Sequence, residues 1–288
     1  MRSEIILAKL LKRIDAPVSC KAAIVNGVKT SYLEAGSGQP VILIHGGDSG
    51  VGGIRWLPVI GPLSRHFNVI APDMPGYGES DKPSASYDRK YFSQWLNCFV
   101  NVVNLSNIRI IAHSLGGAVA LQYALEKPSR IKQLVLVNSA GLGKASQKVS
   151  LHLMFRMMWN NLFPTPRGSE WFLRNQVLYD PTMINQELLE LEEYGRAVVM
   201  MPGGKKVFWL GRGRAIKPFQ MEFLKRVLPS TLIIWGAEDT NFPLSAAQAA
   251  AKIMPNAHLH VIKKAKHLCY YDQTEEFNKV LISYLLGR

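Results

Sequence analysis

The sequence has only three cysteines among 288 residues: Cys20, Cys98 and Cys269. They lie far apart, without a CxxC pair or a Cys/His pairing, which excludes the usual zinc-binding patterns. An odd, scattered set also argues against a disulfide framework and indicates ordinary buried thiols in a reducing compartment. We therefore predict a cytoplasmic protein without a metal site.

Long apolar runs are also missing, because no run approaches the ~18 residues that a membrane-spanning helix needs. We expect no stable membrane insertion. The opening stretch, Met1 to Ile14, has an apolar segment broken by a lysine and lacks a small-residue cleavage site. It is typical of an amphipathic surface helix.

Acidic residues are scarce: 21 Asp and Glu stand against 34 Lys and Arg, which gives a net charge of +13. An excess of this size raises nucleic acid or an anionic membrane as a partner, so the position of the basic residues matters. With 48% hydrophobic and 19% charged residues, the chain has enough apolar side chains for one sizeable core and an inserted domain. This composition excludes a disordered or collagenous chain.

Short strands and helices alternate along the chain. Two β-rich runs within Ala22 to Ala35 flank Asn26-Gly27, a pair suited to a tight hairpin turn, so two edge strands come first. Runs rich in Val, Ile and Leu without polar alternation predict buried parallel strands at Val41–Ile44, Val69–Ala71, Ile108–Ala112, Leu134–Val137, Leu232–Trp235 and Leu259–Ile262. Helical patterns lie at Tyr91–Val103, Gly116–Glu126, Ser245–Ile253 and Thr274–Leu286. The predicted class is α/β, with a mostly parallel sheet flanked by helices.

One interval interrupts this alternation. From Gly141 to Pro218 no strong strand pattern occurs, and apolar segments are punctuated by several prolines. Because the interval lies between two sheet strands, both of its ends must return to the same sheet edge, where the ligand crevices of open α/β sheets form. We therefore predict a core domain of residues 1–140 and 219–288 and a helical cap of residues 141–218.

A sharp turn between a strand and a helix carries the most informative motif, Ala112-His113-Ser114-Leu115-Gly116. Small residues two before and two after Ser114 would let strand and helix nearly touch, with Ser114 exposed at the sheet's carboxyl edge. We predict Ser114 as a nucleophile. The alternative is a chance pattern in which Ser114 only caps the helix. His45-Gly46-Gly47 follows another strand, so backbone N–H groups of Gly47 and Leu115 are candidate donors to a substrate oxyanion.

A serine nucleophile needs a base, and the base needs an orienting acid. His267 falls in a loop between the last strand and the last helix, at the same sheet edge, whereas His113 should point away from its neighbour on so sharp a turn. Asp239 closes another apolar strand and is the predicted acid. Glu238 is its nearest competitor, and Asp272 should already be entering the last helix.

Taken in order, these motifs make the chain similar to the α/β-hydrolase superfamily from about Ile24 to Leu286. The resemblance also rests on the segment Asp73 to Ser80, whose role we expect to be structural. Two positions depart from the common pattern: Ala112 replaces the first glycine of the turn, and Lys266 replaces the glycine before the histidine. The resemblance implies hydrolysis through an acyl-enzyme, with Ser114, Asp239 and His267 as the catalytic triad.

Within the superfamily, the glycine-rich segment His45 to Trp56 and the segment Ser139 to Gly143 partly resemble the meta-cleavage-product hydrolases, which cut carbon–carbon bonds in ring-fission dienoates. That subfamily typically has Asn just before its serine and Trp just after its histidine. Here those positions are His113 and Leu268. We assign Gly46, His113 and Leu268 to substrate binding.

The basic excess is concentrated at the end of the predicted cap. Six basic residues and no acidic one lie between Tyr194 and Met221: Arg196, Lys205, Lys206, Arg212, Arg214 and Lys217. They form either a solvated basic face or a site where Arg196, Arg212 or Arg214 binds a substrate carboxylate. Too few aromatic residues are interleaved to favour a nucleic-acid partner.

The predicted function is hydrolysis of a small, largely apolar carboxylic ester. A carbon–carbon hydrolase of the 2-hydroxy-6-oxo-dienoate type is the alternative, and a small-ligand receptor on the same fold is the alternative without catalysis. The glycines from Gly46 to Gly53 match neither dinucleotide nor P-loop spacing, so we predict no cofactor. The only predicted partner is a small-molecule substrate, and the oligomeric state is left open.

Overall fold

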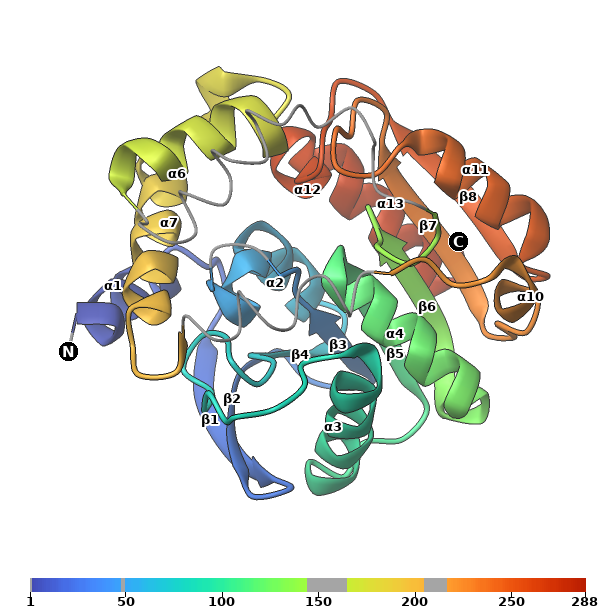
Figure 1. Ribbon diagram of the computed structural model, residues 1–288, viewed down its shortest axis with the longest axis horizontal. Coiled ribbons are helices and arrows are strands. Elements are labelled where there is room, and N and C mark those ends of the chain that lie inside the picture. Colours follow the sequence, from blue (N-terminus) through green and yellow to red (C-terminus); the bar gives the residue numbers. More distant parts are fainter. Residues whose placement is uncertain (1, 48–49, 144–164, 205–216) are drawn as a thin grey trace.

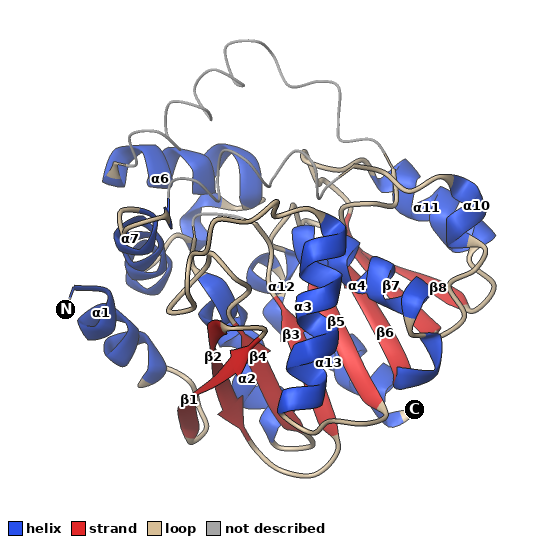
Figure 2. Cartoon of the chain, turned by 60° about the horizontal axis from the view of Figure 1, so that its bottom comes forward, coloured by secondary structure: helices blue, strands red, loops and turns tan. Residues whose placement is uncertain are grey.

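The computed structural model describes residues 2–47, 50–143, 165–204 and 217–288. Its centre is an eight-stranded sheet with the order β1-β2-β4-β3-β5-β6-β7-β8 (Figure 2). The strands are β1 (Val18–Val25), β2 (Val28–Ala35), β3 (Pro40–Ile44), β4 (Asn68–Pro72), β5 (Ile108–His113), β6 (Ile131–Val137), β7 (Ser230–Gly236) and β8 (Ala257–Ile262). From β4 to β8 all neighbouring strands are parallel, whereas the β1–β2 and β2–β4 pairs are antiparallel. The predicted α/β class is confirmed.

Helices cover both faces of this sheet (Figure 1). The α-helices are α1 (Arg2–Leu11), α2 (Leu57–Ser64), α3 (Arg89–Val102), α4 (Leu115–Glu126), α6 (Pro166–Phe172), α7 (Gln186–Val199), α10 (Met221–Leu224), α11 (Leu244–Ile253), α12 (Cys269–Asp272) and α13 (Thr274–Leu286). Short helical turns are η1 (Gly52–Trp56), η2 (Pro128–Arg130), η3 (Leu173–Val177) and η4 (Pro181–Met183).

Successive side chains of the central strands enter two different cores, one on each face of the sheet. Val41 and Leu43 of β3 pack with residues of α2 and α13, whereas Ile42 and Ile44 pack with residues of α3 and α4. Because both faces are covered, every second position must be as apolar as the first. This explains the unbroken Val/Ile/Leu runs of the sequence.

The predicted hairpin forms around Asn26 and Gly27, which both have positive φ, but of its two strands only β1 lies at a sheet edge. Strand β2 pairs with β4 on its other side, so the expectation of two edge strands is wrong for β2. Helix α2 was not predicted because Pro58, Gly61 and Pro62 interrupt its pattern; it starts with a proline in the first turn, where no backbone N–H is needed.

The opening helix is present as α1 and packs alongside α7 (Figure 1). Among the described residues, no helix is both long and apolar enough to cross a membrane. The three thiols are free, but only Cys269 is buried; Cys98 is half-buried and Cys20 is exposed. The expectation of buried thiols therefore holds for one of the three.

Between β6 and β7, α10 precedes β7, and residues 165–204 form α6, η3, η4 and α7 without a strand. These helices lie beyond the carboxyl ends of the strands in Figure 2. The two ends of the interval meet, because the Phe219 N–H donates to the Gly141 carbonyl over 2.9 Å. The division into a core of residues 1–140 and 219–288 and a cap of residues 141–218 stays a prediction.

Candidate active site

Ser114 occupies a strained turn between β5 and α4. Its φ of 51° and ψ of −117° lie in a region that L-residues rarely adopt. A Cβ on Gly116 would lie 2.5 Å from the His45 carbonyl oxygen, so this position needs glycine for α4 to approach the end of β3. The glycine that the sequence motif requires two residues after Ser114 is therefore explained by close packing around the turn.

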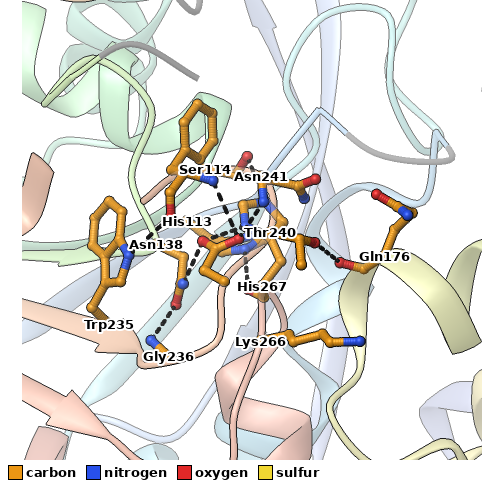
Figure 3. Close-up of polar contacts among 12 residues, drawn as sticks. His113, Ser114, Asn138, Gln176, Trp235, Gly236, Thr240, Asn241, Lys266 and His267 are labelled. Atoms are coloured by element: carbon orange, nitrogen blue, oxygen red, sulfur yellow. Dashed lines mark hydrogen bonds and ion pairs between the residues drawn. The ribbon is translucent and has the colours of Figure 1, made fainter. Parts of the chain in front are cut away.

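The hydroxyl of Ser114 does not cap helix α4, since its side chain makes no capping hydrogen bond. Its Oγ instead lies 3.0 Å from Nε2 of His267, and Nδ1 of His267 lies 3.0 Å from Oδ2 of Asp239. A carboxylate only accepts, so Nδ1 carries the proton and Nε2 is left to accept from the serine. Figure 3 shows His267 facing Ser114 across these contacts.

The sheet register explains why three distant residues meet. His113 pairs with Val137, Val137 pairs with Ile234, and Gly236 pairs with Ile262, so four parallel strands end side by side. The segments that follow these ends carry the serine, an asparagine, the aspartate and the histidine. Residues that are far apart in the sequence therefore lie close together at the carboxyl edge of the sheet.

Asp239 is the carboxylate that faces the imidazole. Its side chain is fully buried, and its Oδ1 accepts backbone N–H groups of Asn241 at 2.8 Å and Phe242 at 3.3 Å. Burial alone would raise the pKa of Asp239, but the electrostatic interaction with the imidazole of His267 and the hydrogen bonds that Asp239 accepts lower that pKa below its ordinary value. The group is therefore held as a carboxylate at neutral pH.

The two competing acids bond elsewhere. Glu238 accepts the Ala265 N–H at 3.0 Å, which ties its own turn to the loop after β8. Asp272 ends helix α12 and accepts the N–H groups of Lys266 and Tyr179 at 2.8 Å each. Burial raises the pKa of Asp272 to about 6 despite these bonds. Both side chains therefore brace the backbone near His267.

Two residues at the site were missed by sequence reasoning. Asn138 follows β6 with a positive φ of 41°, and its Nδ2 donates to Oδ2 of Asp239 over 2.6 Å. His45 accepts the Met74 N–H on Nε2 at 3.0 Å, while its Nδ1 lies 2.6 Å from the Gly46 carbonyl. The available signal was position alone, since both are polar residues at the ends of apolar strands.

The predicted oxyanion donors lie side by side. A Cβ on Gly47 would be 2.8 Å from Cδ2 of Leu115, and Leu115 is the first residue of α4, whose N–H points out of the helix end. A Cβ on Gly46 would be 3.2 Å from Cβ of Ser114. Gly46 therefore leaves space directly beside the nucleophile, and Gly47 leaves space beside the residue that follows it.

His113 and Leu268 are packed into the interior, each 1% exposed. Nε2 of His113 lies 3.0 Å from the His267 carbonyl oxygen, so its ring turns away from Ser114 as the sharp turn predicts. The Leu268 N–H donates to the Val177 carbonyl at 3.0 Å. Their assignment to substrate binding stays a prediction, to which these buried positions add nothing.

The basic residues are only partly placed. Arg196 belongs to α7 and lines a surface hollow with residues of α6 and α7, including Arg167, Glu170 and Glu193. The described residues around this hollow include neither Ser114 nor His267. Arg212 and Arg214 lie outside the described residues, together with Lys205 and Lys206, and Lys217 is exposed. A carboxylate-binding arginine therefore stays a prediction.

The interval between β6 and β7 contacts both loops of the site. Thr240 Oγ1, next to Asp239, donates to the Gln176 carbonyl at 3.0 Å (Figure 3). Together with the Leu268–Val177 and Tyr179–Asp272 bonds, this places residues 176–179 against the loops that carry the acid and the base. Within the described ranges, no three or more His, Cys, Asp and Glu side chains gather as a metal ion would require.

Comparison with known proteins places this geometry in a family. Residues 39–274 match the family model of the alpha/beta hydrolase fold. The 2-hydroxy-6-oxo-6-(2'-aminophenyl)hexa-2,4-dienoic acid hydrolase of Metapseudomonas resinovorans is 30% identical over 269 residues, which cover 91% of this chain and 89% of that protein.

Solved structures agree. The meta-cleavage product hydrolase CumD of Pseudomonas fluorescens IP01, complexed with acetates, has a TM-score of 0.80 at 28% identity and covers 93% of this chain and 97% of its own. The carboxylesterase CesB of Bacillus subtilis has a TM-score of 0.82 at 21% identity, covers 100% and 98%, and shows the fold alone. This chain belongs to the α/β-hydrolase fold family, an enzyme family to which these hydrolases also belong.

Proposed function

We propose that this chain is a serine hydrolase that works through an acyl-enzyme. Ser114 attacks the substrate carbonyl, His267 accepts the serine proton on Nε2, and Asp239 holds the ring in the tautomer this transfer needs. The observation that carries the proposal is the unbroken chain of two 3.0 Å contacts from Ser114 Oγ through the imidazole to Asp239 Oδ2.

The developing oxyanion is stabilised by the backbone N–H groups of Gly47 and Leu115. The close approach of Gly47 to Leu115, the residue that follows Ser114, supports this assignment. His267 then returns the proton to the leaving group, and it activates a water molecule that releases the acyl group from the serine. Residues 141–218 act as a cap over this site, and the bonds from residues 176–179 to the site loops support that role.

The first candidate substrate is a small, largely apolar carboxylic ester. His113 and Leu268 support it, because they stand where the meta-cleavage-product hydrolases typically have Asn and Trp.

The second candidate is a ring-fission dienoate cut at a carbon–carbon bond. The sequence relative from Metapseudomonas and the CumD structure support it, since their names give that chemistry. In this reading the triad promotes ketonisation of the dienol before water cleaves the bond next to the ketone, and a basic residue of the cap binds the carboxylate. The names of these relatives favour the dienoate as strongly as His113 and Leu268 favour the ester.

A substrate panel separates the candidates. p-Nitrophenyl esters of short and medium acids and a ring-fission dienoate would be tested with wild type and Ser114→Ala. We expect turnover with at least one class, and a loss of several orders of magnitude in kcat when Ser114 is removed. A fluorophosphonate should label the wild type at Ser114, which peptide mass spectrometry can locate.

The ratio of kcat/KM for the dienoate to that for the best ester decides the substrate class. A ratio well above one, lost selectively in Arg196→Ala, Arg212→Ala or Arg214→Ala but kept in the control Lys217→Ala, overturns the ester. Ester turnover that is unchanged in these arginine variants supports the ester as the substrate class. Binding of panel compounds without Ser114-dependent turnover would instead indicate a receptor.

A further inference from the structure

The ring of His113 lies behind the nucleophile turn and contacts the backbone of the proposed base. Its Nε2 is 3.0 Å from the His267 carbonyl oxygen, and the two rings lie 4.7 Å apart at 51°. Because a carbonyl only accepts, the neutral His113 ring carries its proton on Nε2 and donates it. The contact is buried, so water does not compete for the carbonyl.

The His113 ring is itself fixed by its surroundings. Tyr270 packs edge-on at 5.3 Å, and Trp56 stacks on Tyr270 at 4.7 Å while also meeting the His113 ring edge-on at 6.2 Å. On another side, a Cβ on Gly46 would lie 2.8 Å from Nδ1 of His113. Glycine at this position therefore leaves the space that the ring occupies.

The backbone around His267 is held at three successive residues. The Lys266 N–H donates to Asp272, the Leu268 N–H donates to Val177, and the His267 carbonyl accepts from His113. The first two bonds tie the loop to α12 and η3. Of these three bonds, only the third ties the loop to β5, the strand that ends directly before the nucleophile.

We infer that His113 is a positioning residue, which fixes the base against the nucleophile through the His267 carbonyl. Ser114 and His113 are adjacent on one strained turn. The turn therefore presents the Ser114 hydroxyl on one side, and on the other side the His113 ring donates a hydrogen bond to the backbone carbonyl of His267. This inference rests on the proposed function. A displacement of about 1 Å in such a site can cost a hundred-fold in rate, so a bond of this kind has a measurable effect on turnover.

Two nearly isosteric variants test the inference. In His113→Gln, the amide nitrogen reaches about the place of Nε2 and keeps a donor, whereas His113→Met has the same length without one. For the best substrate we expect His113→Met to lower kcat about ten- to hundred-fold with KM little changed. His113→Gln should recover kcat to within a few-fold of wild type. Labelling of Ser114 by a fluorophosphonate should slow in the same order.

A proton NMR spectrum adds a readout that a purely structural role would not move. The proton between His267 and Asp239 should give a downfield resonance in wild type and His113→Gln that is shifted or lost in His113→Met. A folded His113→Met with wild-type kcat overturns the inference, and so do equal losses in both variants at unchanged Tm. If His113→Met does not fold, the Gln variant decides alone, because loss of both kcat and the resonance there also overturns it. Wild type that Ser114-directed probes do not label would refute the proposed function instead.

Discussion

Two aspartates of this protein stand in equivalent places and differ in what faces them. Asp73 follows β4 and Asp239 follows β7, both at the carboxyl edge of the sheet. Asp73 accepts the backbone N–H groups of Gly53 at 2.6 Å and Glu79 at 2.8 Å. Asp239 also accepts two backbone N–H groups, but its second oxygen faces His267 and Asn138.

The pKa values of the two groups move in opposite directions. Burial raises the pKa of Asp73 to about 7, because its neutral N–H partners only partly offset the loss of hydration. Burial acts on Asp239 as well, but the imidazole and the hydrogen bonds outweigh it and the pKa falls. Asp73, which holds backbone groups, and Asp239, which is suited to catalysis, therefore share the same position at the sheet edge and the same burial. The ionisable partner separates them.

The largest expected effect tests this comparison on activity. Asp239→Asn should lower kcat by about three to four orders of magnitude, as happens when the acid of a serine triad is made an amide and the histidine takes the wrong tautomer. Asp73→Asn and Glu238→Gln should keep kcat within a few-fold of wild type, because their bonds go to backbone groups. Normal turnover in Asp239→Asn together with loss of turnover in Glu238→Gln would show that Glu238, and not Asp239, is the acid of the triad.

A third buried carboxylate, which faces a charged partner, extends the comparison to the free energy of unfolding. Glu192 of α7 pairs with Arg55 of η1 at 2.7 Å, and the two side chains are 2% and 1% exposed. Glu192→Gln should lower the free energy of unfolding in urea by about 3–5 kcal/mol, because it removes one charge of a buried ion pair. Replacing both by apolar residues should cost less than the single change.

The matched control is the exposed pair Glu222–Lys225 at 3.2 Å, whose side chains are 76% and 58% exposed. Glu222→Gln should change stability by at most about 1 kcal/mol. Equal losses of unfolding free energy in Glu192→Gln and Glu222→Gln would show that burial does not determine how much these ion pairs contribute to stability.

Asp73 should also leave a signature in the pH dependence of stability. Its pKa is about 7 in the folded chain against 3.8 for the free side chain, so between these values the folded state binds a proton that the unfolded state has lost. Stability from this group is full below the lower pKa and falls as pH rises, by at most ~1.4 kcal/mol per pH unit. Asp239 has the opposite sign, since its lowered pKa gives stability that is lost as pH falls.

Urea unfolding of wild type and Asp73→Asn between pH 4.5 and 7.5 measures this slope. The difference in unfolding free energy, wild type minus variant, should decrease steadily across that range by about 3 kcal/mol in total. Parallel curves would mean that Asp73 is ionised throughout, and the contrast with Asp239 would then lose its electrostatic basis.

Sequence patterns predicted the sheet, the flanking helices and the meeting of Ser114, Asp239 and His267. They could do so because each of these residues follows an apolar strand, and parallel strands bring their carboxyl ends to one edge. The structural role of Asp73 was also expected, from a turn-rich segment.

Other features depend on pairing between segments that no local pattern connects. Asn138 reaches Asp239 only because β6 and β7 are neighbours in the sheet. The Arg55–Glu192 pair joins residues 137 positions apart, and its charges look like surface charges in the sequence. The partner of His113, the backbone carbonyl of His267, carries no sequence signal at all. Tertiary contacts of this kind decide which polar residues of a buried edge serve the site.

The smallest expected effect concerns Asn138, the second partner that distinguishes Asp239 from Asp73. Asn138→Gly removes the 2.6 Å bond to Oδ2 of Asp239 while keeping a backbone that accepts the φ of 41°. Loss of one hydrogen bond to a charged group is worth about 1.5–3 kcal/mol, so kcat should fall about ten- to 150-fold. Asn107→Gly is the control, because Asn107 has a similar φ of 50° but is exposed and remote in the sheet, before β5. It should leave kcat unchanged. Equal rates for the two variants would mean that Asn138 contributes nothing to the ionisation and orientation of Asp239.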